Sequence, residues 1–161
     1  LPHADGALHH AVADAYKRHF RAAREAGEIS QALFAGIRDV LDGLRAQGWT
    51  LAGGTGMSER RPGAWPGMHG LTGHFASLQT ADRHPSKPHP AMLEAALLEC
   101  GALPGEAVMI GDTQFDMAMA RDAGVRAVGA GWGYHAPREL LEAGAETVAQ
   151  TPESLLEHLL R

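Results

Sequence analysis

The stretch AVMIGDTQFD, residues 107–116, decides the predicted fold. Its first four residues form a continuous apolar run, which is typical of a strand buried on both faces of a parallel sheet. Gly111, Asp112 and Thr113 end that run, and a helix is predicted over residues 114–123. A buried strand that leads through a short polar turn into a helix is the repeating unit of an α/β domain.

The segments on both sides of this stretch continue the alternation of strand and helix. Further strands are predicted at residues 49–53, 75–79, 126–129 and 147–149. Further helices are predicted at residues 33–44, 90–101, 137–143 and 152–160, from apolar residues at helical spacing and from Pro and Gly at the ends. Right-handed connections between such elements give a doubly wound, Rossmann-like sheet with three layers, α/β/α.

Two segments fall outside this pattern. Residues 8–23 carry apolar side chains at helical spacing, and they predict an amphipathic helix that ends near Gly27. Residues 57–70 contain Pro62 and Pro66 among several glycines, so an irregular segment is expected there.

Composition excludes several classes of protein. With 161 residues, 45% of them hydrophobic, the chain is long enough for one domain with its own core. The net charge of -5 is spread along the sequence, which argues against a nucleic-acid partner. No apolar run approaches the roughly 20 residues of a membrane span.

The single cysteine and the N-terminal residues indicate the cellular compartment and the extent of the chain. Cys100 has no partner for an intramolecular disulfide, which favours a reducing, cytoplasmic compartment. It lies on the apolar side of a predicted helix, and we expect a small hydrophobic residue there rather than a nucleophile. The first residues, LPHADG, resemble neither a signal peptide nor a natural start, so a truncated chain is expected.

The polar residues that follow the predicted strands suggest where the chemistry lies. In an open parallel sheet, ligands bind beyond the carboxyl ends of the strands. Thr55 and Gly56 follow the first strand, Lys87 follows the second, and Asp112 and Asp116 follow the third. A hydroxyl, backbone N–H groups and an ammonium bind phosphoryl oxygens, and carboxylates bind Mg²⁺.

We therefore expect Thr55, Gly56 and Lys87 to bind a phosphate ester and Asp112 and Asp116 to serve a metal ion. The spacing of the two aspartates, four residues apart across a strand-to-helix turn, allows one to ligate the ion. The other would then orient the loop or a bound water.

Each of these residues also has a purely structural interpretation. Asp112 is a possible helix N-cap, and Asp116 would stabilise a first helical turn through the helix dipole. Lys87 alone is compatible with an ordinary solvated lysine, and Thr55 with a turn residue. Four histidines, His74, His84, His89 and His135, match no zinc-binding spacing. Trp132 and Tyr134 are expected to pack at the mouth of the site.

Taken together, three of the stretches resemble the haloacid dehalogenase superfamily. GDTQFDMAMA, residues 111–120, is similar to the fourth motif of that superfamily, SKPHP at residues 86–90 to the third, and Thr55-Gly56 to the second. The order of the elements and WGYH at residues 132–135 extend the resemblance. The most similar branch is the phosphoglycolate phosphatase-like one, which has a helical cap.

The resemblance implies a Mg²⁺-dependent phosphatase that forms an aspartyl-phosphate on a small phosphorylated metabolite. By analogy, Thr55 would bind a phosphoryl oxygen and Lys87 would stabilise the charge of the nucleophile and the phosphoryl group. Asp112 would ligate Mg²⁺, and Asp116 would support the metal loop. Residues 1–30 would be a remnant of the helical cap, and residues 31–161 would form the core domain.

The sequence departs from the family pattern in two places. The Asp-x-Asp-Gly-Thr motif, which carries the nucleophile on a central strand, is absent; residues 2–6 overlay it only with His3 at the nucleophile position. No apolar strand precedes Asp5, so we assign it no role. After Thr55-Gly56, Met57 and two prolines replace the usual basic residue and regular helix.

These departures lead to further expectations. Thr55, Lys87 and Asp112 should converge at one edge of a single sheet. The chain alone should be inactive, and Leu51 and Val108 should be left with unpaired backbone groups and exposed apolar faces beside the missing strand. A phosphosugar mutase and a non-catalytic phosphate- or partner-binding remnant are the alternative functions.

Overall fold

The computed structural model describes residues 32–56 and 70–160, together with residues 8, 11–12, 14–16, 18–19 and 22. The chain divides into two compact units, residues 1–32 and 33–161. In the first unit every described residue from 8 to 22 is helical, as predicted. The predictions on residues 2–6, Asp5 included, and on residues 57–69 lie outside the described residues. The assignment of residues 1–30 to a cap stays a prediction.

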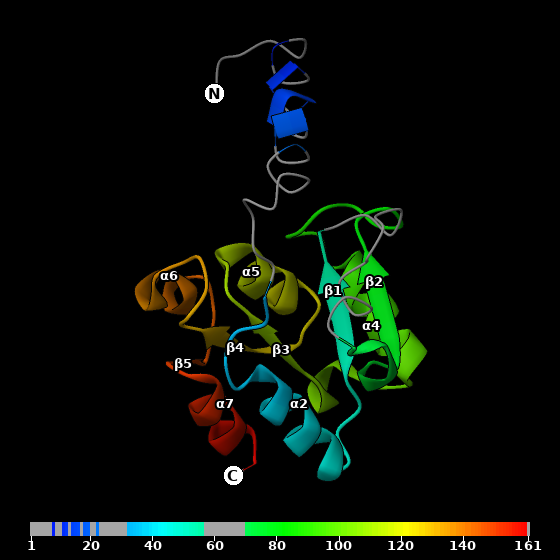
Figure 1. Cartoon of the computed structure of the whole chain (residues 1–161). Helices are drawn as coiled ribbons and strands as arrows, with labels where there is room; N and C mark the ends of the chain where they lie inside the picture. The colour runs from blue at the N-terminus through cyan, green and yellow to red at the C-terminus, as the bar shows by residue number, and fades with distance from the viewer. Residues whose placement is uncertain are drawn as a thin grey trace. The chain divides into compact units, whose positions relative to one another are not determined.

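The second unit contains parallel strands in two sheets (Figure 1). In the first sheet, β1 (Ala52–Thr55) pairs with β2 (Ser77–Thr80). In the second, the order is β3 (Val108–Gly111), β4 (Arg126–Ala130) and β5 (Thr147–Ala149). In the part of the chain that the structure describes, the expectation of a single continuous sheet is therefore wrong. Among the described residues no strand pairs with the free edges of β1 and β3.

The helices of the second unit follow the predicted positions. They are α2 (Ile37–Ala46), α4 (Ala91–Cys100), α5 (Gln114–Asp122), α6 (Pro137–Glu142) and α7 (Pro152–Leu159), with short 3-10 turns at Thr72–His74 and Pro104–Glu106. Helix α2 begins at Ile37 rather than at residue 33 because Gly36 has a φ of 82°, which is incompatible with a continuing helix. Gly101, with a φ of 65°, ends α4 as predicted.

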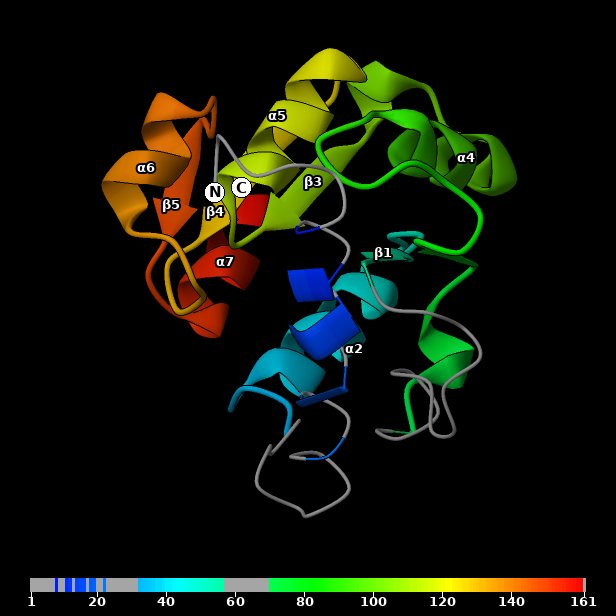
Figure 2. The same cartoon turned by 90° about the horizontal axis from the view of Figure 1, so that it is seen from above.

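The sheet β3-β4-β5 lies between two layers of helices, α5 and α6 on one face and α2 and α7 on the other (Figures 1 and 2). Apolar side chains fill both interfaces: Leu97, Met117, Ala120, Val125, Ala127, Leu140 and Ala145 in one cluster, and Val40, Leu44, Val128, Ala149 and Leu155 in the other. Burial on both faces explains the continuous apolar runs of these strands. The predicted three-layer α/β/α architecture is confirmed.

The two sheets share parts of this core. Leu97 lies on α4, the helix that contacts β1 and β2, yet it belongs to the first apolar cluster. Leu51 and Val108, from the two sides of the gap, both pack against the second cluster. The Leu51 carbonyl also accepts a hydrogen bond from Ala76 N at 2.8 Å. The expectation of an unpaired Leu51 carbonyl is therefore wrong. Leu51 and Val108 are partly buried against the second cluster, so their apolar faces are covered in part.

Within the described residues, no helix combines the length and the apolar character needed to cross a membrane.

Candidate active site

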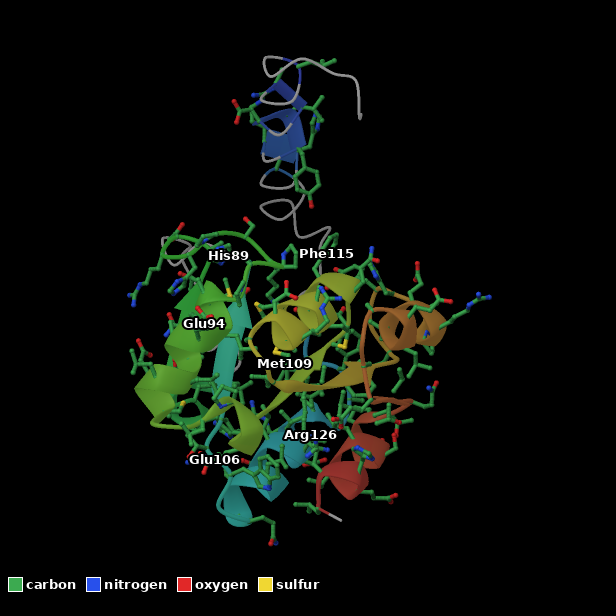
Figure 3. All side chains as sticks on the ribbon, turned by 180° about the vertical axis from the view of Figure 1, so that it is seen from behind. His89, Glu94, Glu106, Met109, Phe115 and Arg126 are labelled. Atoms are coloured by element: carbon green, nitrogen blue, oxygen red, sulfur yellow. The ribbon has the colours of Figure 1, made fainter. Side chains whose placement is uncertain are left out.

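The predicted site residues lie at the carboxyl ends of the strands. Lys87 lies in the loop between β2 and α4, whereas Asp112 and Asp116 follow β3. Thr55 is the last residue of β1 and not part of the following loop, since β1 runs two residues beyond the predicted end at residue 53. His89 lies two residues after Lys87 in the same loop, and Phe115 directly precedes Asp116. Figure 3 shows both residues at one end of the unit and Glu106 and Arg126 at the other end.

Lys87 joins the two sheets at this edge. Its Nζ donates a hydrogen bond to the Gly54 carbonyl of β1 at 3.1 Å and to Asp116 Oδ1 at 2.7 Å. The Asp116 side chain is 5% exposed and that of Lys87 is 22% exposed, so solvent screens this ion pair only weakly. These two bonds bring Lys87 together with Gly54, the neighbour of Thr55, and with Asp116 in the first turn of α5. The convergence of Thr55 and Asp112 themselves with Lys87 stays a prediction.

Asp116 uses both of its carboxylate oxygens inside the protein. Oδ1 binds Lys87, while Oδ2 accepts from Thr113 N at 3.1 Å and from Thr113 Oγ1 at 2.8 Å. Thr113 Oγ1 in turn accepts from Asp116 N at 3.3 Å, which makes a reciprocal cap of α5. Of the two roles predicted for the aspartate pair, this geometry favours the orienting role for Asp116. Direct ligation of a metal by Asp116 stays a prediction.

Asp112 is held by the loop that follows β4. Its Oδ2 accepts a hydrogen bond from Tyr134 N at 3.1 Å, and its carbonyl accepts one from His135 N at 3.1 Å. The N-cap of α5 is Thr113, so the structural interpretation of Asp112 as the cap is wrong. Asp112 also lines a cavity of about 250 Å³ together with Phe34, Ile110, Ala130 and Trp132.

The donor set around Asp112 fits one part of a Mg²⁺ site. Its Oδ1 receives no hydrogen bond from the residues that the structure describes, so one anionic oxygen is available. Mg²⁺ is commonly held by one or two carboxylates, with waters and substrate phosphate completing the shell. In the described part of the chain no group of three or more Asp, Glu, His or Cys side chains gathers. Asp112 would therefore be one protein ligand among partners from elsewhere.

The structure adds site residues that the sequence analysis missed. The Gly54 carbonyl binds Lys87, and His135 Nδ1 accepts a hydrogen bond from Gln114 N at 3.2 Å in the first turn of α5. Gly133 approaches Asp112 so closely that a Cβ on Gly133 would collide with Cβ of Asp112. A glycine between two aromatic residues in the loop after a strand was the available signal, because glycine allows a close backbone approach.

The two aromatic residues of the loop after β4 differ in how far they are buried. Trp132 lines the Asp112 cavity and packs against the second apolar cluster, as expected for the mouth of the site. Tyr134 is 90% exposed, so the prediction that it packs there is wrong. Its backbone N–H, rather than its ring, contacts Asp112.

Gly133→Ala tests the close approach. We expect a loss of about 1–3 kcal/mol in the free energy of unfolding, because the added methyl group would push the β4 loop or Asp112 out of place. Urea denaturation measures this loss. Gly105→Ala is the control: nothing lies within 4 Å of a Cβ there, and a change within about 0.5 kcal/mol is expected. Equal losses in the two variants would contradict the packing argument.

The four histidines and the cysteine each have a local environment of their own. His74 binds Asp42, His84 binds Gln79, His89 accepts from Ala91 N, and His135 accepts from Gln114 N, so each of the four has its own partner. Cys100 is partly buried, and burial raises the pKa of its thiol, which lowers the fraction of reactive thiolate at neutral pH.

Comparisons with known proteins give a consistent family. A family model described as haloacid dehalogenase-like hydrolase matches residues 2–124. "Probable phosphatase IndB" from Dickeya dadantii is 36% identical over 121 residues, which cover 74% of this chain and 52% of that protein. A phosphoglycolate phosphatase from Chromobacterium violaceum is 37% identical over 106 residues, covering 63% of this chain and 46% of that protein. The chain thus spans about half the length of these relatives.

A solved structure extends the likeness to the fold. A crystal structure from Haemophilus somnus, described as a predicted phosphoglycolate phosphatase, superposes with a TM-score of 0.77. The match covers 89% of this chain and 65% of that one at 23% sequence identity. At this identity the likeness concerns the fold alone, and it supports the three-layer arrangement described above.

Proposed function

The chain belongs to the haloacid dehalogenase-like hydrolase family, and on that basis we propose that it is part of a Mg²⁺-dependent phosphatase for a small phosphate monoester. The observation that carries the proposal is the position of Lys87 Nζ, between the Gly54 carbonyl and Asp116 at the carboxyl edge of both sheets. The relatives named as phosphoglycolate phosphatases support a small, phosphoglycolate-like substrate.

The residues of this chain would divide the work as follows. Lys87 supplies a positive charge at the edge where a phosphoryl group would lie, and Asp116 fixes the direction of that charge. The Thr55 hydroxyl and the Gly56 N–H would bind phosphoryl oxygens beside it. Asp112 would contribute one oxygen to Mg²⁺. When bound, that ion neutralises charge on the phosphoryl oxygens.

The attacking carboxylate would have to come from outside the described residues. Both carboxylate oxygens of Asp116 accept hydrogen bonds, from Lys87 and from Thr113, and Asp112 is assigned to the metal. The family resemblance places the nucleophile on an Asp-x-Asp-Gly-Thr strand. The free edges of β1 and β3 leave room in the sheet order for such a strand between them.

We expect the 161 residues alone to release no phosphate from a chromogenic phosphate ester or from phosphoglycolate, with Mg²⁺ or with a chelator. The reason is that, in the part of the chain that the structure describes, the two aspartates of the site are assigned to Lys87 and Thr113 and to the metal, which leaves neither as the attacking carboxylate. The measurement is phosphate release, followed alongside a thermal melt. Turnover by this chain with a cooperative melt would show that the nucleophile was misplaced, and it would bring Asp5 back as a candidate.

The proposal itself is tested with the protein expressed from its full gene. Mg²⁺-dependent release of phosphate is the expected result, and an Asp-x-Asp-Gly-Thr motif encoded upstream of Leu1 would support it. Interconversion of a phosphosugar through a bisphosphate intermediate would identify the mutase alternative. Binding of inorganic phosphate without turnover would identify the non-catalytic alternative.

A further inference from the structure

Strand β2 carries three buried polar side chains, Ser77, Gln79 and Thr80, and the first two of them form a network that the proposed function does not use. Ser77 is 3% exposed and Gln79 is 2% exposed, at positions where a buried strand usually carries apolar residues. Burying such groups costs free energy unless they form hydrogen bonds. We therefore expect both side chains to have hydrogen-bond partners, and one of these partners lies in the loop that carries Lys87.

The two side chains belong to a hydrogen-bonded network with a fixed direction. Gln79 Nε2 donates to Ser77 Oγ at 2.9 Å, and Gln79 Oε1 lies 2.8 Å from His84 Nε2. An amide oxygen only accepts, so His84 Nε2 carries the proton and donates it. At the other end, hydrogen bonds from Ser77 and Gln79 lower the pKa of the exposed Glu99 carboxylate.

The network ends in the loop that carries Lys87. His84 lies three positions before Lys87, after a turn closed by the hydrogen bond from Arg83 N to the Thr80 carbonyl at 3.2 Å. Beyond Lys87, a second turn joins His89 N to the Ser86 carbonyl at 3.2 Å. His84 thus attaches the first half of the loop to the interior of the first sheet through a side-chain contact.

We propose that Gln79 and His84 are positioning residues for Lys87. A lysine has a flexible four-carbon stem, so its ammonium stays in one place only when its backbone is fixed. The His84–Gln79 contact fixes the start of the loop, and the contacts of Lys87 with Gly54 and Asp116 then hold the ammonium. The importance of that position rests on the proposed function, but the positioning itself is measurable without any turnover.

The sequence provides a direct probe, because Lys87 and Lys17 are its only two lysines. A limiting amount of an amine-acetylating reagent is applied to the 161-residue chain, and mass spectrometry gives the rate at Lys87 relative to that at Lys17. His84→Ala is expected to raise this ratio about fivefold, because the loosened loop frees the ammonium from Asp116. His84→Gln should restore the original ratio, since its amide N–H can donate to Gln79.

His74→Ala is the matched control. His74 also makes a side-chain hydrogen bond, to Asp42 at 2.9 Å, but it lies before β2 at the amino end of the strand. Its loss should leave the Lys87 to Lys17 ratio unchanged. Gln79→Leu gives a second test from the strand side, with an increase like that of His84→Ala expected.

An unchanged ratio in His84→Ala, with a cooperative thermal melt, would overturn the proposal. Failure of His84→Gln to restore the ratio would also count against it. If Gln79→Leu unfolds the protein, its melt reveals this, and His84→Ala, whose side chain is only partly buried, decides the question. A response of the ratio in a full-length protein that lacks turnover would support the positioning role and contradict the proposed function.

Discussion

Lys87→Met is expected to lower the free energy of unfolding by about 3–5 kcal/mol, because it leaves the buried carboxylate of Asp116 without its counter-charge. The same change removes the hydrogen bond from Lys87 to the Gly54 carbonyl, so the link through Lys87 from β1 to α5 is lost. A loss of this size is a large part of the roughly 5–15 kcal/mol that stabilises a typical domain. Urea denaturation of the wild-type and variant chains measures it.

Two further variants separate the buried charge from other effects. Arg138→Met breaks the ion pair with Glu142, whose side chains are 87% and 62% exposed, and a loss of at most about 0.5 kcal/mol is expected. Adding Asp116→Asn to Lys87→Met should recover part of the stability, since the uncompensated charge disappears. A Lys87→Met variant that loses no more than Arg138→Met would contradict a buried, structurally important pair.

Asp112→Ala is expected to reduce Mg²⁺-dependent turnover by about 10³-fold in a form of the protein that is active, because the proposed metal loses its ligand from this chain. The effect on folding should be small. The hydrogen bond from Tyr134 N to Oδ2 is lost, at a cost of about 1 kcal/mol. Phosphate release at several Mg²⁺ concentrations and circular dichroism measure the two effects.

Asp112→Asn refines this test, because its amide oxygen still accepts from Tyr134 N while the negative charge is gone. A loss of turnover with unchanged stability would assign the effect to the charge. Asp122→Ala is the control: this exposed aspartate ends α5 and binds Arg121, so turnover should stay unchanged. Full activity of Asp112→Ala at saturating Mg²⁺ would contradict the metal role.

The sequence predicted the elements around residues 107–116 well, because local signals there agree with the tertiary structure. The apolar run forms β3, and the polar turn leads into α5 at the expected place. The T-x-x-D pattern of Thr113 and Asp116 was also present as a local signal of a helix start. That pattern predicts the two bonds from Thr113 that occupy Asp116 Oδ2, and these bonds place Asp116 in the helix cap as well as beside the predicted metal loop.

Backbone contacts between residues far apart in the chain could not be predicted from the sequence. The extension of β1 to Thr55 depends on its pairing with β2, where Gly54 lies opposite Gln79, since Gly-Gly-Thr has no strong preference for a strand. The acceptor at Gly54 is a carbonyl, which every residue possesses, so no residue type marked it as a ligand of Lys87. The break between the sheets, likewise, follows from which strands are present rather than from any local pattern.

The bridge made by Lys87 has a thermodynamic consequence. The two sheets have no strand-to-strand pairing with each other among the described residues, so an opening at this boundary would break side-chain contacts such as that of Lys87 but no sheet hydrogen bonds. A ligand bound by groups from both sides of the boundary, Thr55 on one and Asp112 on the other, would oppose that opening. At a concentration 100 times its dissociation constant, such a ligand adds about 2.7 kcal/mol to the stability of the folded state. By this linkage, binding of a ligand at the site would raise the free energy of unfolding of the second unit.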